Sequence, residues 1–446
     1  MNMLKAGFSR VNVNPMMGIE VAGYFIQRLA DGILDDLEAN TVSISLGDKR
    51  QVFVSVDSCH LEKNVIAEVV RICKEKYNIP EGTVHINATH THTSPHNSLE
   101  SDDPLIKQYS EMLVLKLVDA VKFAIDDEKP AKLGFGKSHA PHIGFCRRFI
   151  MKDGSIRTNP GAGNPNILKP ISEIDQDVSV LRFDREGANT IVMVNYANHP
   201  DVVGGCKLSA DWPGFARRIF EKAIDNTSLA FYNGALGDIN HVNVFPKGGD
   251  NNDLTNDFDD VMRGYGHARH MGNVVAAAVM QVYDKVEYVE PDSFTYKSIT
   301  VNVPANKAKE EELPEAIRIN DLHNAGRDNE LPYEGMELTT VVAEAGRMVN
   351  MMNAPDYFGT GVSAAKLGRI GFITMPGEAF SDIQVALKKA EGYDCVFVIG
   401  LADEYSGYFP MMSAYDEGGY EARSSRFRAG VGELYIEEGK KLLESL

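Results

Sequence analysis

Short apolar segments alternate with amphipathic helical segments along most of this chain, and this alternation is the feature that most constrains its fold. It predicts an α/β class with a mixed, largely parallel sheet flanked by helices. No Pro/Gly/Ser-rich linker separates the two halves, so we expect a single domain over residues 1–446, with a charged helical excursion at about 305–352 lying over the sheet. The expected strands include 41–46, 51–57, 84–90, 178–183, 190–199 and 229–234, and the expected helices include 61–77, 104–126, 213–224, 264–284 and 379–391.

One expected strand, 84–90, runs directly into His90-Thr91-His92 before the chain breaks at Pro95. Two imidazoles two positions apart on an extended chain project from the same face, so both can reach one small object such as a metal ion. Histidine is the commonest metal ligand, and zinc is the metal that we expect here. Two histidines that only form hydrogen bonds at a strand end would show the same pattern.

Four further expected strands also end on side chains that can bind metal or move protons. They lead to His199, to Asp238, to Glu378 and to the pair Tyr405 and Tyr408. Several such ends that converge on one edge of a sheet would build a site. Each has a plainer interpretation when taken singly: a turn cap for His199, an Asx turn for Asp238 and a helix N-terminal charge for Glu378.

Composition argues against several classes of partner. Lys and Arg number 45 against 63 Asp and Glu, a net charge of −18, which disfavours nucleic acid or an anionic membrane as the main partner. Residues 1–15 lack the apolar core of a signal peptide and no apolar run is long enough to cross a bilayer, so we expect a cytoplasmic protein without a stable membrane anchor. The five cysteines show no C-x-x-C spacing and are expected to be reduced thiols.

The same motifs, in this order, resemble the neutral, non-lysosomal ceramidases and their ceramidase-like relatives. The resemblance begins with AGFSRVNVNP and continues through THTHTSP, NHPD, LSADWPG, NGALGDIN, MPGE and EYSGYFPMMSAYDEGGYEA. It extends from residue 6 to about residue 428. It implies a zinc-dependent hydrolase that cleaves an amide (N-acyl) bond in a small-molecule or lipid-like substrate.

Carried over by motif, the resemblance implies four zinc ligands, namely His90, His199, Glu378 and Tyr408. Two neutral imidazoles, a carboxylate and a phenol oxygen also suit a borderline Lewis acid on chemical grounds, and zinc-activated water would then be the nucleophile. The competing assignment, in which both His90 and His92 are ligands, stays open.

Further residues are implied for catalysis. His92 would act as general acid or base, or donate a hydrogen bond to the oxyanion. Tyr420 would donate to the developing oxyanion, and Arg147 would bind a substrate carbonyl or anionic group through its planar fork, although the adjacent Arg148 competes for that assignment. Two carboxylates are candidates to orient a ligand histidine: Asp57 and Asp211.

The chain departs from the family where ceramidases carry Gly-Asp-x-Ser-Pro, with a serine implicated in catalysis. It has Asp238-Ile239-Asn240-His241 there, so this serine nucleophile is missing. Asn240, next to Asp238, could still donate to an oxyanion, and His241 adds a proton carrier or ligand. The loop after the His pair also differs, and the sequence ends without room for the C-terminal immunoglobulin-like domain of true ceramidases.

These departures concern substrate recognition more than metal chemistry, so the sequence predicts zinc hydrolysis more strongly than it predicts ceramide as substrate. The polar loops 160–166 and 247–257 would suit a small hydroxylated or acylated metabolite, but the solubility of surface loops is the simpler explanation of their polarity. Three other interpretations compete: an ester hydrolase, a zinc lyase or isomerase acting on a small polar metabolite, and a non-catalytic, metal-stabilised binding protein. Another divalent metal would also accept imidazole and carboxylate ligands, and the oligomeric state is left open.

Overall fold

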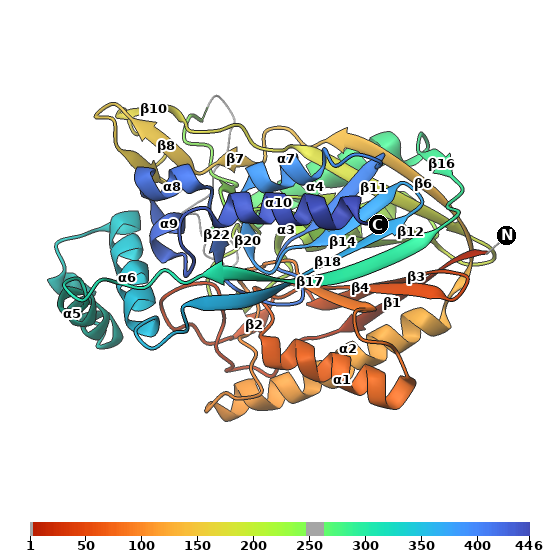
Figure 1. Ribbon diagram of the computed structural model, residues 1–446, viewed down its shortest axis with the longest axis horizontal. Coiled ribbons are helices and arrows are strands. Elements are labelled where there is room, and N and C mark those ends of the chain that lie inside the picture. The colour runs from red at the N-terminus through yellow and green to blue at the C-terminus, as the bar shows by residue number, and fades with distance from the viewer. Residues whose placement is uncertain (1–2, 247–262) are drawn as a thin grey trace.

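A computed structural model describes residues 3–246 and 263–446. Within these ranges two main β-sheets pack between layers of helices (Figure 1), and four further sheets have only two or three strands each. The polar loop 247–257 that was predicted to contact a metabolite lies outside the described residues. The larger sheet follows the path β14 (Thr227–Asn233), β12 (Thr190–Tyr196), β11 (Asp177–Arg185), β6 (Lys129–His139), β1 (Leu4–Asn12), β3 (Glu38–Leu46), β4 (Lys49–Val56) and β5 (Val84–Ala88), with β16 (Glu287–Val289) also paired to β6.

The second sheet has four strands and packs against the inner face of the first. Its order is β17 (Phe294–Pro304), β18 (Tyr357–Leu367), β19 (Ile370–Thr374) and β21 (Cys395–Ile399). The core between the sheets draws apolar side chains from both halves of the chain. Phe53 of β4 stacks on Phe372 of β19 with ring centroids 4.7 Å apart, so residues more than 300 positions apart share one core.

Helices cover the outer faces of both sheets. Alternate residues of the larger sheet point away from the inter-sheet core and pack against α1 (Lys63–Tyr77) and α2 (Pro104–Asp126) at one end and α3 (Asp211–Ala223) and α4 (Tyr265–Tyr283) at the other. The smaller sheet is covered by α7 (Ser381–Leu387) and α10 (Val431–Glu444). None of the helices in the described ranges has the length and apolar character needed to span a bilayer.

The predicted mixed α/β class is confirmed, but the expectation of a largely parallel sheet is wrong. In the larger sheet only β12–β14 and β4–β5 are parallel, and the other pairings described are antiparallel. Tight hairpins account for part of this antiparallel pairing. The two-residue Gly47-Asp48 loop, with Gly47 at φ +63°, joins β3 directly to β4 and requires antiparallel pairing.

The helical excursion also differs from its prediction. It contains α5 (Leu313–Asn324), the short 3₁₀ turn Asp328–Glu330 and α6 (Gly335–Asn350). These helices bury their apolar residues against each other, and α6 packs on α9 (Tyr420–Ser424). They therefore project from one end of the molecule, at the left of Figure 1, rather than lying over the sheet.

The larger sheet curls so that its terminal strands approach each other. The hydroxyl group of Tyr232 in β14 donates a hydrogen bond of 3.0 Å to the carbonyl oxygen of Phe53 in β4, and Nδ2 of Asn233 donates to the carbonyl oxygen of Thr89 at 2.8 Å. The segments that follow β5, β12, β14 and β19 therefore meet in one region. This convergence of several strand ends was predicted, although it uses two sheets and not one sheet edge.

Candidate active site

Three side chains from these strand ends form a buried cluster. Nε2 of His199 lies 3.1 Å from Oε2 of Glu378, and Nε2 of His90 lies 3.5 Å from the same oxygen. The ligand atoms of all three residues lie within 4.8 Å of one another. Each residue is at most 3% exposed, so the structure places three of the four predicted ligands in one enclosed group.

His90 follows β5 but does not continue an extended strand. Its φ is +77°, a left-handed value that residues other than glycine seldom adopt. The prediction that His90 and His92 project from one face of an extended segment is therefore wrong. The turn still brings their Nε2 atoms to 3.3 Å, and Nδ1 of His90 donates to the carbonyl oxygen of Cys59 at 2.6 Å.

His199 is held in the same way. Its Nδ1 donates to the carbonyl oxygen of Ile239 at 2.7 Å, and its own carbonyl oxygen accepts a hydrogen bond from the indole Nε1 of Trp212 at 3.2 Å. Because a carbonyl oxygen only accepts hydrogen bonds, Nδ1 carries a proton in both His90 and His199, and Nε2 is the nitrogen that faces the cluster. Such a hydrogen bond from the second nitrogen is the usual support of a metal-bound imidazole.

Glu378 begins β20 (Glu378–Ala379), which pairs in parallel with β22 (Tyr408–Phe409). Glu378 and Tyr408 are register partners in this pair, so the fourth predicted ligand lies next to the carboxylate. Oε1 of Glu378 accepts a hydrogen bond of 2.9 Å from the hydroxyl group of Tyr405. Gly237 allows this arrangement, because a Cβ atom at that position would lie 2.5 Å from the carbonyl oxygen of Glu378.

The protonation states of Glu378, His90 and His199 are set by burial and by the charged groups next to each side chain. Burial acts to raise the pKa of Glu378, but His90 and His199 outweigh it and hold the pKa well below 4.5. Burial acts to lower the pKa of His90, but the carboxylate of Glu378 and the thiol of Cys59 raise it well above 6.5. Burial, together with Arg147, lowers the pKa of His199. Without a metal the site therefore holds an imidazolium–carboxylate pair and one neutral imidazole.

This donor set fits a divalent metal ion. A cation among the Nε2 atoms would compensate the buried carboxylate that a proton on His90 otherwise compensates. Burial and the Glu378 carboxylate raise the pKa of Tyr408 well above 10, so its phenol is neutral in the metal-free protein. A second compact group in the described part of the chain consists of Cys59, His90 and His92, and the alternative that both histidines of the pair are ligands stays a prediction.

His92 lies beside the cluster. Its Nε2 faces His90, and its Nδ1 lies 3.5 Å from Oδ1 of Asp201. The ring packs edge-on against Tyr24 with centroids 5.6 Å apart. Burial lowers the pKa of His92 to about 3, so this imidazole is neutral at pH 7.

Arg147, rather than Arg148, reaches the cluster. Its Nε donates to Oε1 of Glu421 at 2.6 Å, its Nη2 donates to the carbonyl oxygen of Gly237 at 2.6 Å, and its Nη1 lies 3.4 Å from Nε2 of His199. Arg148 instead pairs with Glu417 at 2.8 Å. The guanidinium of Arg147 is therefore fixed on two edges, with its third nitrogen facing the candidate ligands.

Tyr420 lies on the same side of the cluster as Tyr408. The two rings are 5.5 Å apart, and the guanidinium of Arg147 lies 5.4 Å from the centroid of Tyr408 and 6.0 Å from that of Tyr420. Burial raises the pKa of Tyr420 above its usual value of 10. Its neutral hydroxyl group remains a hydrogen-bond donor at neutral pH.

Two predicted catalytic residues are turned away from the cluster. The carboxylate of Asp238 accepts hydrogen bonds from the backbone N–H and the hydroxyl group of Ser381, at 2.8 and 3.0 Å. Asn240 donates from Nδ2 to Oδ1 of Asn159 at 2.7 Å and accepts from the backbone N–H of Val242 at 3.0 Å. Both side chains tie loops together. For Asp238 this is a long-range contact with Ser381, and not the local Asx turn that was the plainer interpretation of the sequence.

The carboxylates predicted to orient ligand histidines have other partners. Asp57 pairs with Arg217 at 2.8 Å, and Asp211 accepts the backbone N–H groups of Val202 and Val203, both at 2.9 Å. Backbone carbonyl groups take the orienting role instead. His241 is buried, and its Nδ1 has no hydrogen-bond partner within the described residues.

Two residues around the cluster were given no role from the sequence: Asp201 faces His92 and Glu421 holds Arg147. Tyr405, which was predicted only as a strand-end side chain able to bind metal or move protons, holds Glu378. Asp201 and Glu421 each lie within two positions of a predicted site residue, in NHPD and GGYEA. This proximity in sequence was the only signal that these two carboxylates belong to the site. It did not indicate which side chain each of them contacts.

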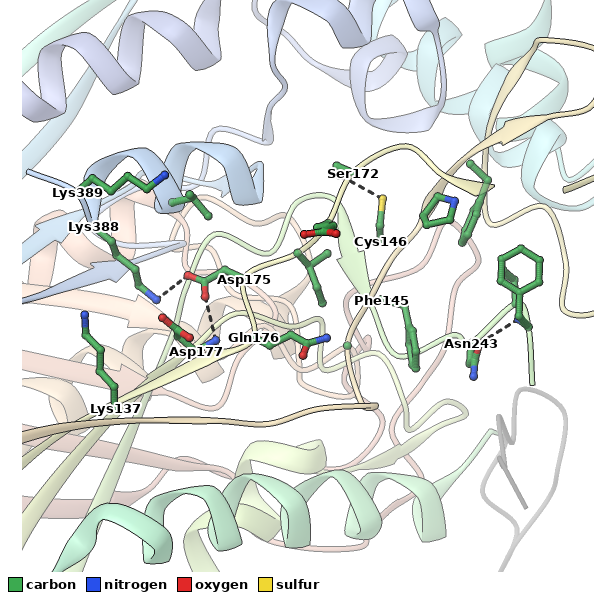
Figure 2. Close-up of a pocket in the computed structure, with 18 residues that line it drawn as sticks. Lys137, Phe145, Cys146, Ser172, Asp175, Gln176, Asp177, Asn243, Lys388 and Lys389 are labelled. Carbon is green, nitrogen blue, oxygen red and sulfur yellow. Dashed lines mark hydrogen bonds and ion pairs between the residues drawn. The ribbon is translucent and has the colours of Figure 1, made fainter. Parts of the chain in front are cut away.

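A cavity of about 840 Å³ lies apart from these residues (Figure 2). It is lined by Phe145, Cys146 and Phe149, by segments 170–177 and 243–245, and by Lys388 and Lys389 of the α7 region. Lys388 is paired with Asp175 at 2.7 Å. None of the four candidate ligands is among its described lining residues, so chemistry rather than cavity size marks the candidate active site.

A protein-family comparison matches residues 7–261 to the neutral/alkaline non-lysosomal ceramidase N-terminal region. This match covers more than half of the chain. The chain belongs to the neutral/alkaline non-lysosomal ceramidase family. The resemblance read from the sequence motifs is therefore confirmed at the level of the family.

Individual ceramidases agree with this assignment. Neutral ceramidase 1 of Arabidopsis thaliana is 24% identical over 224 residues, which cover 46% of this chain but only 27% of that protein. The crystal structure of neutral ceramidase from Pseudomonas aeruginosa superposes with a TM-score of 0.72 at 17% identity, covering 99% of this chain and 74% of that chain. A structure described as ceramidase complexed with C2 gives the same TM-score at 16% identity and covers 75% of that chain. At these identities the structural matches establish the ceramidase fold.

Proposed function

We propose that this ceramidase-family chain is a zinc-dependent hydrolase that cleaves an amide (N-acyl) bond, with His90, His199, Glu378 and Tyr408 as metal ligands. One observation carries the proposal: two imidazoles, each fixed through Nδ1 by a backbone carbonyl, turn their Nε2 atoms toward one carboxylate oxygen. Two imidazoles and a carboxylate are a common ligand set of catalytic zinc. When bound, zinc supplies a Lewis acid that activates water and polarises a carbonyl group.

The residues around the ligands transfer the proton and stabilise the developing negative charge. His92 is neutral, and its Nε2 faces the cluster, so it takes a proton from the attacking water and returns it to the leaving nitrogen. Tyr420 donates a hydrogen bond to the oxygen on which negative charge develops, and the fixed guanidinium of Arg147 places a positive charge nearby. Asn240 takes no part as a nucleophile, because its amide cannot attack and both its ends hold loop atoms.

The substrate class follows from the family. The related proteins carry ceramidase in their names, and ceramide is an N-acyl amide, so N-acyl amides are the first substrates to examine. Ceramide itself is one member of that set. The position of the family's serine is occupied by Asn240, so hydrolysis of the amide rests on activated water and His92.

The deciding experiment measures the metal content of untagged, purified protein by elemental analysis. We expect about one zinc per chain, lost in His90→Ala and in Glu378→Ala. His85→Gln is a matched control: His85 is a buried histidine bonded to Asp403 at 2.8 Å outside the cluster, and this variant should keep its zinc. Folded wild-type protein that binds no metal would overturn the proposal.

Activity is then measured on the zinc-loaded protein. A panel of N-acyl amides of different chain lengths, ceramide included, is compared with esters of the same acyl groups. His92→Ala should keep its zinc and lose turnover by about 100-fold or more. A variant that keeps both zinc and turnover would remove His92 from the mechanism.

A further inference from the structure

Asp201 is a half-buried carboxylate two positions after the candidate ligand His199, and it faces His92. Its Oδ1 lies 2.5 Å from the hydroxyl group of Tyr24, 2.6 Å from Nη1 of Arg263 and 3.5 Å from Nδ1 of His92. Arg263 in turn is placed by an antiparallel bridge to Val203. The carboxylate is thus fixed by two donors and has the imidazole as its third neighbour.

His92 is packed so that each of its nitrogens faces a different group. Its backbone N–H donates to the carbonyl oxygen of Pro200 at 3.1 Å, and its carbonyl oxygen accepts from Nη2 of Arg28 at 2.8 Å. Gly23, at φ +105°, lies so close that a Cβ atom there would be 2.7 Å from the ring. The ring therefore has little freedom to rotate. Its Nδ1 forms no hydrogen bond within the described residues, and Oδ1 of Asp201 lies 3.5 Å from it.

We propose that Asp201 is a positioning residue for His92, held in place by Tyr24 and Arg263. The proposal rests on the proposed function, in which His92 moves the proton. A carboxylate at Nδ1 accepts a hydrogen bond from that nitrogen, so the neutral ring carries its proton there and presents a lone pair at Nε2. Catalytic hydrogen bonds are often long before substrate binds, and 3.5 Å becomes a hydrogen bond with a small shift.

The proton balance of the reaction explains why a carboxylate is useful there. As water attacks the acyl carbon, one of its protons passes to Nε2, and the ring becomes an imidazolium with protons on both nitrogens. The C–N bond then breaks, and the proton at Nε2 passes to the leaving nitrogen, so water plus amide gives carboxylic acid plus amine. Asp201 stays ionised throughout and stabilises the imidazolium, the part that a buried aspartate has in hydrolytic triads.

A purely structural interpretation is that Asp201 only neutralises the half-buried guanidinium of Arg263. The two interpretations differ in what Asp201→Asn should do. The amide keeps the size of the side chain and an oxygen for Tyr24 and Arg263, but it no longer places a negative charge at Nδ1 of His92. If Asp201 positions His92, the variant should lose turnover but keep its zinc and its fold. If Asp201 only pairs with Arg263, the variant should lose stability but keep its turnover.

The experiment uses the full chain loaded with zinc. In Asp201→Asn we expect kcat to fall by about 100-fold or more, with KM changed by less than about threefold and zinc content unchanged. Asp201→Glu, which restores the charge, should recover part of kcat. Asp57→Asn is the matched control, because it alters an aspartate–arginine pair, with Arg217, that does not contact His92; it should lower stability and leave kcat within about threefold.

A second readout needs no substrate. Long-range proton–nitrogen NMR correlation on protein labelled with ¹⁵N-histidine reports which ring nitrogen carries the proton, and His92→Gln identifies the signals of His92. We expect the Nδ1-protonated form in the wild type, because Nδ1 is the nitrogen that faces the carboxylate. The Nε2-protonated form in the wild type, or an unchanged kcat in Asp201→Asn, would overturn the proposal. If the wild type hydrolyses nothing, the NMR result still decides the role of Asp201 separately from the proposed function.

Discussion

The hydroxyl group of Tyr405 donates a 2.9 Å hydrogen bond to Oε1 of Glu378, while Oε2 of the same carboxylate lies 3.1 Å from Nε2 of His199. The carboxylate is thus oriented from behind by a neutral donor and presents its other oxygen to the candidate metal position. Partners of this kind fix the rotamer of a ligand and affect metal affinity although they do not touch the metal.

Tyr405→Phe should therefore weaken zinc binding by about 10-fold to 100-fold without emptying the site at saturating zinc. The phenyl ring keeps the packing of Tyr405 against His60, whose ring lies 4.7 Å away, so the fold should persist. Competition with a chelator measures the affinity. Tyr393→Phe removes a hydroxyl group bonded to the carbonyl oxygen of Leu443 instead and should leave it unchanged; equal affinities in all three proteins would contradict the prediction.

Local signals sufficed to predict most elements of this fold, because apolar periodicity and capping residues act over short stretches. The expected helix 104–126 begins and ends as predicted, with Asp103 capping Leu105 at 2.7 Å. Strand direction was predicted wrongly, because it depends on hairpins such as Gly47-Asp48. That the strands form two sheets depends on contacts such as Phe53 with Phe372, which no local pattern encodes.

The residues of the candidate site could likewise be predicted only in part from the sequence. Side chains at strand ends, namely His90, His199 and Glu378, could be predicted because such ends converge, and the structure brings these three together. Residues that act through other residues could not be assigned. Asp238 follows β14 much as Glu378 follows β19, yet its carboxylate is directed to Ser381, and only the three-dimensional course of these loops decides between the two outcomes.

Zinc binding should become weaker as the pH falls. Glu378 raises the pKa of His90 well above 6.5, so the metal-free protein holds a proton on His90 at pH 7 that the metal must displace. Because protons compete with the metal below that pKa, affinity should fall about tenfold for each unit by which the pH is lowered. Titrations between pH 6 and 8 in buffers of different ionisation enthalpy should also detect about one proton released. Affinity that does not change with pH would mean that His90 is neutral before the metal binds.

Arg147 and Glu421 form a buried ion pair, with side chains 8% and 0% exposed. Arg147→Ala leaves the Glu421 carboxylate without its main partner, and this should cost about 3–5 kcal/mol in the free energy of unfolding, measured with urea. The double variant Arg147→Met with Glu421→Gln removes both charges and should regain a large part of that loss. If the double variant is no more stable than Arg147→Ala, the pair is not what stabilises this region.

Asn240→Ala tests whether the position of the family's missing serine still contributes to catalysis. The substitution removes hydrogen bonds to Asn159 and to the backbone of Val242, which should cost about 1–2 kcal/mol of stability. Because Asn240 is directed to these loop atoms, kcat of the zinc-loaded protein should stay within about tenfold of the wild type, whereas His92→Ala should lose about 100-fold or more. Steady-state rates on the best N-acyl substrate, at a temperature where all variants are folded, measure the difference. A loss in Asn240→Ala as large as that in His92→Ala would show that the amide of Asn240 contacts the reacting atoms after substrate binds, and the loop contacts would then have to open during the reaction.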